Sequence, residues 1–140
     1  MVEQTRTPMS AAEFEALPES NLPTELIEGE LVVRGTPTIR HQRTAGNIYT
    51  RLRGIVPDGE VFYAPVSVKF DDGNYDQPDV LWVAPASACE ITAGGLNGPP
   101  DLVVEVISPG SAKTDRGVKL QTYQRYGVRE YWLVEPDLAF

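Results

Sequence analysis

Two carboxylates lie at positions where a β-strand would normally have apolar side chains. Asp79 opens the run PDVLWV, and Glu105 lies in the middle of the run DLVVEVI. An unpartnered carboxylate inside a buried strand costs several kcal/mol, so Glu105 should be protonated, paired with a cation or bound to a metal. The plainest alternative is a buried ion pair, for example with an arginine of the basic segment described below.

If the two carboxylates lie close together, a bound metal ion becomes the favoured explanation. Adjacent strands can bring Asp79 and Glu105 within a few ångströms, where two like charges stay ionised cheaply only beside a cation. Ligation by two carboxylates, water and a substrate phosphate suits Mg²⁺, with Mn²⁺ as a substitute. A zinc site is not indicated, because His41 is the only histidine and Cys89 the only cysteine.

A lysine follows the Glu105 segment on a predicted helix. Asp115, Lys119 and Tyr123 are one turn apart and share a face of that helix. If this face looks towards the end of the Glu105 strand, the ammonium group reaches the carboxylate pair. There it could orient or deprotonate an attacking water, or stabilise charge on a transferring phosphate. The alternative is an ordinary ion pair between Asp115 and Lys119.

One segment is basic although the chain has a net charge of −8. Residues 31–57 contain no Asp or Glu, and they include Arg34, Arg40, Arg43, Arg51 and Arg53. The net charge argues against a protein that coats nucleic acid by bulk attraction, so a local basic surface matters more. A solvated helix face that balances acidic neighbours is the alternative.

Apolar periodicity and turn residues predict the elements that must position these side chains. We expect helices over residues 10–17, 38–56 and 112–126, a hairpin over 24–33, and strands over 61–70 (broken near Pro65), 78–83, 101–107 and 131–134. Residues 71–75 are expected to be a link and 84–100 a loop. In the long helix the apolar stripe comprises Ala45, Ile48, Leu52, Ile55 and Val56, with His41 one turn before it. This order predicts an α+β sandwich around a mixed central sheet.

Composition narrows the class of protein. The chain has 140 residues, with 41% hydrophobic and 23% charged residues, so we expect one globular domain over residues 1–140. No stretch approaches the roughly 20 apolar residues of a membrane span, and the N-terminus lacks an apolar signal core. We therefore expect a cytoplasmic protein without a membrane partner. Phosphate-loop, dinucleotide, serine-hydrolase and zincin motifs are absent.

Three segments resemble the Uma-type restriction endonuclease family: TELIEGELVV, QPDVLWV and PDLVVEVISPGSAKTDRGVKLQTYQRYGVREYWLVEP. That family belongs to the PD-(D/E)XK nuclease superfamily, and the resemblance runs from about Met9 to Asp137. It implies a restriction-endonuclease-like core of helix, three strands, helix and strand. It also implies Mg²⁺-dependent phosphodiester hydrolysis. The implied core agrees with the element order predicted from residue 38 onward.

The resemblance implies roles for individual residues. Asp79 matches the aspartate after the signature proline, and Glu105 matches the second acidic ligand. Ile107 stands where the superfamily pattern has lysine, and Lys119 matches a lysine that the family supplies from the following helix.

Two further residues match the family. Glu25 matches an acidic residue of the N-terminal hairpin and is a candidate third metal ligand. His41 matches a frequent histidine at the start of the long helix. His41 and Tyr123 are expected beside the metal ligands, with a core histidine as the alternative for His41. Such domains commonly continue past EYWLVEP, so a C-terminal truncation of this chain stays open.

The resulting hypothesis is a metal-dependent endonuclease acting on DNA. Asp79 and Glu105 hold Mg²⁺, Lys119 serves the attacking water, and the predicted nucleic-acid contacts are Arg40, Arg43 and Arg51. A homodimer is expected, because double-strand cleavage by one site per chain usually needs two subunits. The rival is a nuclease-like module without turnover that binds nucleic acid or protein.

Overall fold

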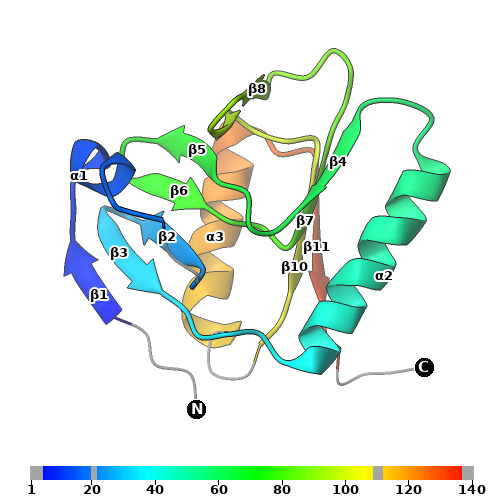
Figure 1. Ribbon diagram of the computed structural model, residues 1–140. Helices are drawn as coiled ribbons and strands as arrows, with labels where there is room; N and C mark the ends of the chain where they lie inside the picture. The colour runs from blue at the N-terminus through cyan, green and yellow to red at the C-terminus, as the bar shows by residue number, and fades with distance from the viewer. Residues whose placement is uncertain (1–4, 20–21, 109–111, 137–140) are drawn as a thin grey trace.

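The computed structural model describes residues 5–19, 22–108 and 112–136, and its centre is a four-stranded sheet (Figure 1). The strands lie in the order β11 (Glu130–Val134), β10 (Leu102–Val106), β7 (Val80–Val83) and β4 (Glu60–Tyr63). β10 is parallel to β11 and antiparallel to β7. The predicted α+β class with a mixed central sheet is therefore confirmed.

Helices cover both faces of this sheet. On one face α2 (Ile39–Ile55) packs Leu52 against Val80, Leu102 and Val104. On the other face Tyr123 of α3 (Ala112–Tyr126) packs in a cluster with residues that include Leu81 and Val103. Because β7 and β10 are covered on both sides, their runs are almost continuously apolar.

A second, seven-stranded sheet packs beside α3 (Figure 1). Its order is β1 (Thr5–Pro8), β3 (Glu30–Val33), β2 (Thr24–Ile27), β6 (Asn74–Asp76), β5 (Val68–Asp71), β9 (Gly95–Asn97) and β8 (Glu90–Thr92). Phe70 of β5 contacts Tyr123 with ring centroids 5.5 Å apart. The second sheet therefore shares a core with the first and faces α3.

Local signals explain several of the element boundaries. α1 (Ala11–Glu15) begins with a capping box between Ser10 and Glu13. The β2–β3 hairpin turns at Glu28 and Gly29, both with positive φ, as a tight primed turn requires. Thr38 caps α2 by accepting a hydrogen bond from the backbone N–H of His41. No helix in the described part of the chain has the length and apolar composition of a membrane span.

Three details of the sequence prediction are wrong. Residues 71–75 are more than a link, because β6 follows the turn at Asp72 and Gly73 and pairs with β5. The segment 84–100 contains the β8–β9 hairpin. Ile55 is 71% exposed, since the last turn of α2 extends beyond the cluster around Leu52.

We predict that Gly59, in the turn between α2 and β4, cannot be replaced by alanine without loss of stability. Its φ is +76°, and an added Cβ would lie 2.3 Å from the carbonyl oxygen of Val83. Gly59→Ala should lower the free energy of unfolding by about 2 kcal/mol or more, measured by urea denaturation. The control is Gly54→Ala in α2, where nothing lies within 4 Å of the added Cβ and stability should rise by roughly 0.5–1 kcal/mol. Equal effects at the two positions would contradict this account.

Candidate active site

Asp79 and Glu105 lie opposite each other at the ends of two neighbouring strands. The register pairs Val80 of β7 with Val104 of β10, and the backbone N–H of Asp79 donates to the carbonyl of Val104 over 3.1 Å. The backbone N–H of Val106 donates to Asp79 Oδ2 over 2.7 Å. The same antiparallel register, continued by one residue, places Asp79 beside Glu105. The structure thus brings together the two carboxylates that the sequence singled out.

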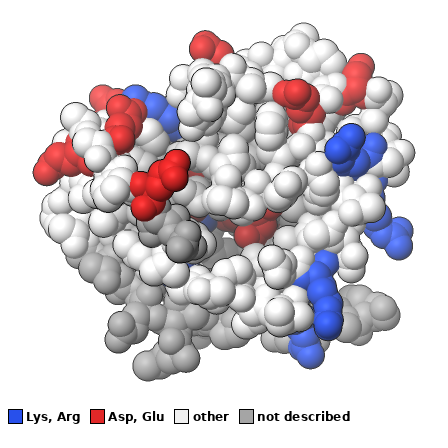
Figure 2. Space-filling view, in the orientation of Figure 1, with Lys and Arg blue, Asp and Glu red and all other residues white. Residues whose placement is uncertain are grey.

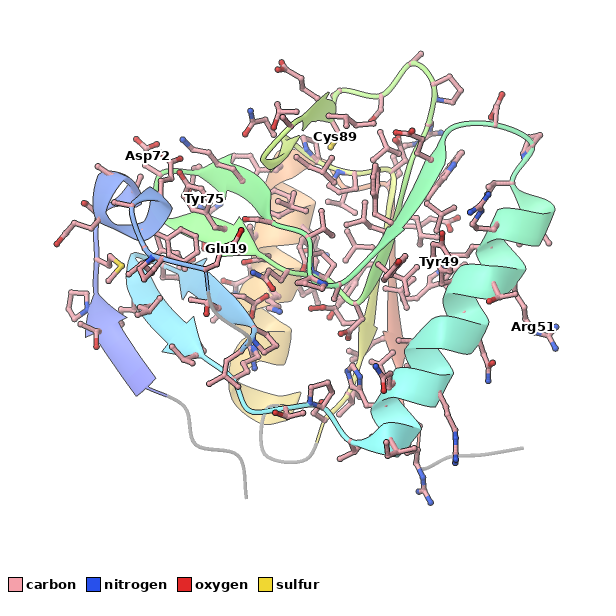
Figure 3. All side chains as sticks on the ribbon, in the orientation of Figure 1. Glu19, Tyr49, Arg51, Asp72, Tyr75 and Cys89 are labelled. Carbon is pink, nitrogen blue, oxygen red and sulfur yellow. The ribbon has the colours of Figure 1, made fainter. Side chains whose placement is uncertain are left out.

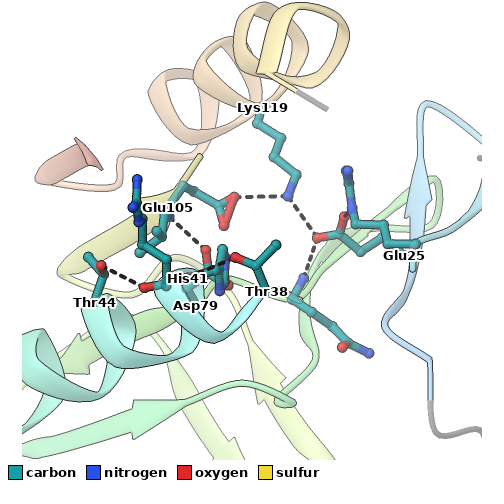
Figure 4. A network of polar contacts seen from close by, with 11 residues as sticks. Glu25, Thr38, His41, Thr44, Asp79, Glu105 and Lys119 are labelled. Atoms are coloured by element: carbon teal, nitrogen blue, oxygen red, sulfur yellow. Dashed lines mark hydrogen bonds and ion pairs between the residues drawn. The ribbon is translucent and has the colours of Figure 1, made fainter. Parts of the chain in front are cut away.

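Lys119 of α3 joins this pair to the second sheet (Figure 4). Its Nζ lies 2.8 Å from Glu105 Oε2 and 2.8 Å from Glu25 Oε2. All three side chains are buried. Lys119, and not an arginine of the basic segment, is therefore the partner seen for Glu105. The side chain of Asp115, the other predicted partner of Lys119, lies outside the described residues.

Glu25 is held by donors from three segments of the chain. Its Oε1 accepts from Arg34 Nε over 2.7 Å, and its Oε2 accepts from the backbone N–H of Gln77 over 2.7 Å as well as from Lys119. Burial opposes ionisation of this carboxyl, but the charges of Lys119 and Arg34 outweigh burial and lower its pKa. Glu25 is thus an ionised carboxylate whose two oxygens both accept hydrogen bonds.

His41 approaches the site from the first turn of α2. Its Nε2 lies 3.3 Å from Asp79 Oδ1, and this hydrogen bond is the main cause of a raised pKa for His41. Its Nδ1 is buried and has no hydrogen-bond partner among the described residues. His41 is therefore more than a core histidine, because it fixes one oxygen of Asp79 while Val106 fixes the other.

Asp76 is a site residue that the sequence reasoning missed. It is 1% exposed, and neither carboxyl oxygen has a hydrogen-bond partner among the described residues. Burial raises its pKa to about 8. The β2–β6 register pairs Leu26 with Tyr75, so Asp76 lies beside Glu25. A carboxylate at an inward position of a strand is the signal that could have found it, but β6 was not predicted.

Tyr123, which was expected beside the metal ligands, is buried close to Glu105, Asp76 and Glu25. Its hydroxyl is buried and unpartnered within the described part of the chain. Burial raises the pKa of this hydroxyl well above its usual value. Tyr123 is therefore a neutral group at the floor of the site. Cys89 lies elsewhere in the core, and burial raises the pKa of its thiol to about 11, as expected for an unreactive cysteine.

Burial and neighbouring charges shift the pKa of the groups in the cluster. Burial raises the pKa of Glu105, the charge of Lys119 lowers it and the charge of Asp79 raises it, with a net pKa of about 7. Glu105 and Glu25 raise the pKa of Lys119 although burial lowers it, so the lysine is a permanent cation. Figure 2 shows a hollow in the middle of the molecular surface with acidic atoms on its floor.

The donor set fits a hard divalent cation. Mg²⁺ prefers carboxylate oxygens and keeps much of its water, so one or two carboxylates and a substrate phosphate are enough. Asp79 and Glu105 provide two such groups opposite each other. Among the described residues no three His, Cys, Asp or Glu side chains form a ready-made metal site. The two carboxylates therefore fit a cation whose remaining ligands are water and substrate.

The three predicted phosphate-binding arginines lie on α2, all exposed: Arg40, Arg43 and Arg51. Figure 3 shows Arg51 pointing away from the sheet. They follow the same helix whose first turn presents His41 to Asp79. The structure thus places a basic surface on the helix that leads to the carboxylate pair.

We predict that Asp76→Asn removes a pH-dependent loss of stability. The folded-state pKa of about 8 lies above the ordinary value of 3.8, so this group's contribution is full below about pH 4 and is lost as pH rises towards about 8. In chelator, the stability of Asp76→Asn relative to wild type should rise by at least about 1 kcal/mol between about pH 5 and pH 9, measured by urea unfolding. Exposed Asp58→Asn is the control. A difference that stays constant with pH would rule out this account.

Comparisons with known proteins agree with this architecture. The model of the Uma2 family, described as "Putative restriction endonuclease", matches residues 11–139. A crystal structure titled as a "putative nuclease belonging to DUF820", from Anabaena variabilis, superposes with a TM-score of 0.79 at 22% sequence identity. The match covers 93% of this chain and 75% of that chain, and it shows a shared restriction-endonuclease-like fold. A search of curated proteins gives no match. Because the family model spans nearly the whole sequence, the chain belongs to the Uma2 restriction endonuclease family.

Proposed function

We propose that this protein hydrolyses phosphodiester bonds in DNA with the help of Mg²⁺. The observation that supports the proposal is the pair of Asp79 and Glu105 on neighbouring strands, with Lys119 directly hydrogen-bonded to Glu105. Carboxylates that hold a cation beside a fixed ammonium group are suited to a reaction in which negative charge develops on phosphate. Membership in a nuclease family agrees with this chemistry.

Asp79 and Glu105 are the residues that would hold the metal. When bound, Mg²⁺ would polarise the phosphate and lower the pKa of a bound water. Asp79 is prepared for this role, because Val106 and His41 each fix one of its oxygens. Each carboxylate oxygen has a second lone pair, so these hydrogen bonds leave room for a cation.

Lys119 acts in this proposal as a permanent donor of hydrogen bonds. Its raised pKa argues against the alternative that it deprotonates water. Two of its three N–H groups point to Glu25 and Glu105, and the third is suited to an attacking water or a phosphate oxygen. Charge stabilisation is therefore the role that the contacts favour.

Glu25 remains a candidate third metal ligand, but its contacts favour a different role. Both of its oxygens already accept strong hydrogen bonds, from Arg34 on one side and from Gln77 and Lys119 on the other. We propose that Glu25 holds the ammonium of Lys119 in place. The homodimer also remains a proposal, which rests on the need for two sites in double-strand cleavage.

A binding module without turnover is the second candidate. The observation in its favour is that Lys119 lies between Glu25 and Glu105, and that no three-ligand group is formed among the described residues. Such a protein would keep the basic surface of α2 and bind nucleic acid without cutting it. Metal binding separates the two candidates.

We predict that Mg²⁺ and Mn²⁺ bind the wild-type chain in the micromolar to millimolar range, measured by calorimetry at neutral pH. Asp79→Asn and Glu105→Gln each remove a charged oxygen donor, so each should weaken binding by about tenfold or more. Glu60→Gln on exposed β4 is the matched control and should change nothing.

The same variants decide between the two candidates in a cleavage assay. Cleavage of plasmid and single-stranded DNA should require the metal and disappear in Glu105→Gln, while DNA binding persists. Cleavage that survives chelator would contradict the mechanism. DNA binding without metal binding or cleavage in any variant would favour the binding module.

We predict that the three exposed arginines of α2 contact phosphates. The triple replacement of Arg40, Arg43 and Arg51 by alanine should weaken DNA binding and flatten its salt dependence. The slope of log K against log salt should fall by about 0.9 for each phosphate that the protein no longer neutralises. Arg129→Ala, an exposed arginine between α3 and β11, is the control. An unchanged slope in the triple variant would show that this surface does not bind the backbone.

A further inference from the structure

A buried carboxyl group beside the Lys119 bridge makes no hydrogen bond. Asp76, the last residue of β6, is 1% exposed, and neither of its oxygens has a partner in the part of the chain that the structure describes. Buried polar groups in folded proteins are nearly always hydrogen-bonded, because an unmet group loses its hydration without compensation. An unmet acceptor at this depth points to a donor that reaches it in another arrangement of the site.

Two strand registers fix the direction of the Asp76 side chain. The β5–β6 register pairs Asp76 with Val68, which lies in the same core cluster as Tyr123 of α3. The β2–β6 register, continued by one residue, places Asp76 opposite Glu25, whose carboxylate accepts from Lys119 of α3. Directly paired residues project to the same face of a sheet. Asp76 therefore projects towards α3, as Glu25 does.

The helix opposite this face carries two polar groups. Lys119 and Tyr123 are one turn apart on α3, and both side chains are buried. The Tyr123 hydroxyl, like the oxygens of Asp76, has no hydrogen-bond partner among the residues described. Burial raises the pKa of Asp76, and the charge of Lys119 lowers it. Asp76 thus lies in the same buried space as the ammonium group.

Lys119 is the group that a cation on Glu105 would disturb. Its ammonium donates to Glu25 and to Glu105, each with an oxygen 2.8 Å away. Glu105 is also one of the two carboxylates proposed to hold Mg²⁺. A cation there repels the ammonium and competes with it for the same carboxylate, and such effects are strong where water is excluded. The ammonium then needs another acceptor, because a buried charge without a partner is strongly destabilising.

Asp76 is the acceptor suited to replace Glu105. Glu25 already accepts from Arg34, from the backbone N–H of Gln77 and from Lys119. Both oxygens of Asp76 are open within the described residues. A lysine has a flexible four-carbon stem with three rotatable donors, so its ammonium can move between acceptors while the helix stays in place.

We propose that Lys119 exchanges its hydrogen bond to Glu105 for one to Asp76 when a divalent cation binds Asp79 and Glu105. Glu25 holds the ammonium in both arrangements, and the third N–H stays available to an attacking water or a phosphate oxygen. Asp76 is a positioning residue in this view, because it acts through Lys119 and touches neither metal nor substrate. The inference rests on the proposed function and deepens it.

A double-mutant cycle on metal affinity tests the exchange. Mg²⁺ is titrated by calorimetry into wild type, Asp76→Asn, Lys119→Gln and the double variant, at about pH 9, where Asp76 is mostly ionised. Asp76→Asn should weaken binding about tenfold while Lys119 is present, because the ammonium then stays on Glu105. In the Lys119→Gln background the same change should alter the affinity by less than about threefold. Asp58→Asn, at an exposed position, is the control and should change neither.

A crystal structure of the wild-type chain grown with Mg²⁺ reads the exchange directly, and it does not require that Lys119→Gln folds. Lys119 Nζ should lie within about 3.2 Å of an Asp76 oxygen and more than about 3.5 Å from Glu105 Oε2. Mg²⁺ on Asp79 and Glu105 with the ammonium still on Glu105 would overturn the exchange.

The outcomes separate this inference from the proposed function. A direct effect of the Asp76 charge on the cation would weaken binding equally with and without Lys119. If Asp76→Asn has equal effects in the two backgrounds, or none in either, then the exchange is overturned, while metal-dependent cleavage by the wild-type chain would leave the proposed function standing. If the wild-type chain binds no Mg²⁺, then both proposals fail.

Discussion

The buried bridge from Glu25 through Lys119 to Glu105 is the interaction on which the rest of the arrangement depends. Glu25 belongs to the seven-stranded sheet, Glu105 to the four-stranded sheet, and Lys119 to the helix between them. Removal of one partner would leave a charge buried without compensation, which destabilises proteins strongly. The bridge therefore fixes how the two sheets and α3 meet, and the hollow with the carboxylate pair forms where they meet.

The sequence predicted the elements and side chains whose signals are local. Apolar periodicity and capping residues predicted α2, α3 and the β2–β3 hairpin close to their observed bounds. Asp79 and Glu105 stood out because a carboxylate interrupts an apolar strand, which is a conflict visible without coordinates. Lys119 followed from its place on the helix face after that strand. These inferences needed only the order of neighbouring elements.

Features that depend on contacts between distant segments could not be predicted. Asp76 lies beside Glu25 only because β6 pairs with β2, and a three-residue strand gives too short a pattern to recognise. Two of the donors to Glu25 are similarly remote, since Gln77 and Lys119 come from other parts of the chain. Ile55 continues the apolar stripe of α2, yet it is exposed and lies outside the cluster around Leu52. The point along a helix at which other elements stop covering its apolar stripe depends on tertiary packing, so the sequence of the helix does not show it.

The position of the lysine on a helix has a consequence for the chemistry of the site. A lysine two residues after Glu105 would lie on the same strand, and its place would be set by that strand alone. Lys119 instead donates hydrogen bonds to two carboxylates from different sheets, so the packing of both sheets against α3 sets the position of its ammonium group. The ammonium is shared by Glu25 and Glu105, with an oxygen of each 2.8 Å away, while Asp79 lies beside Glu105 on the neighbouring strand. One lysine thus compensates Glu25 and Glu105 together, so the stability of the fold depends on the same residues from which we propose that the metal site is built.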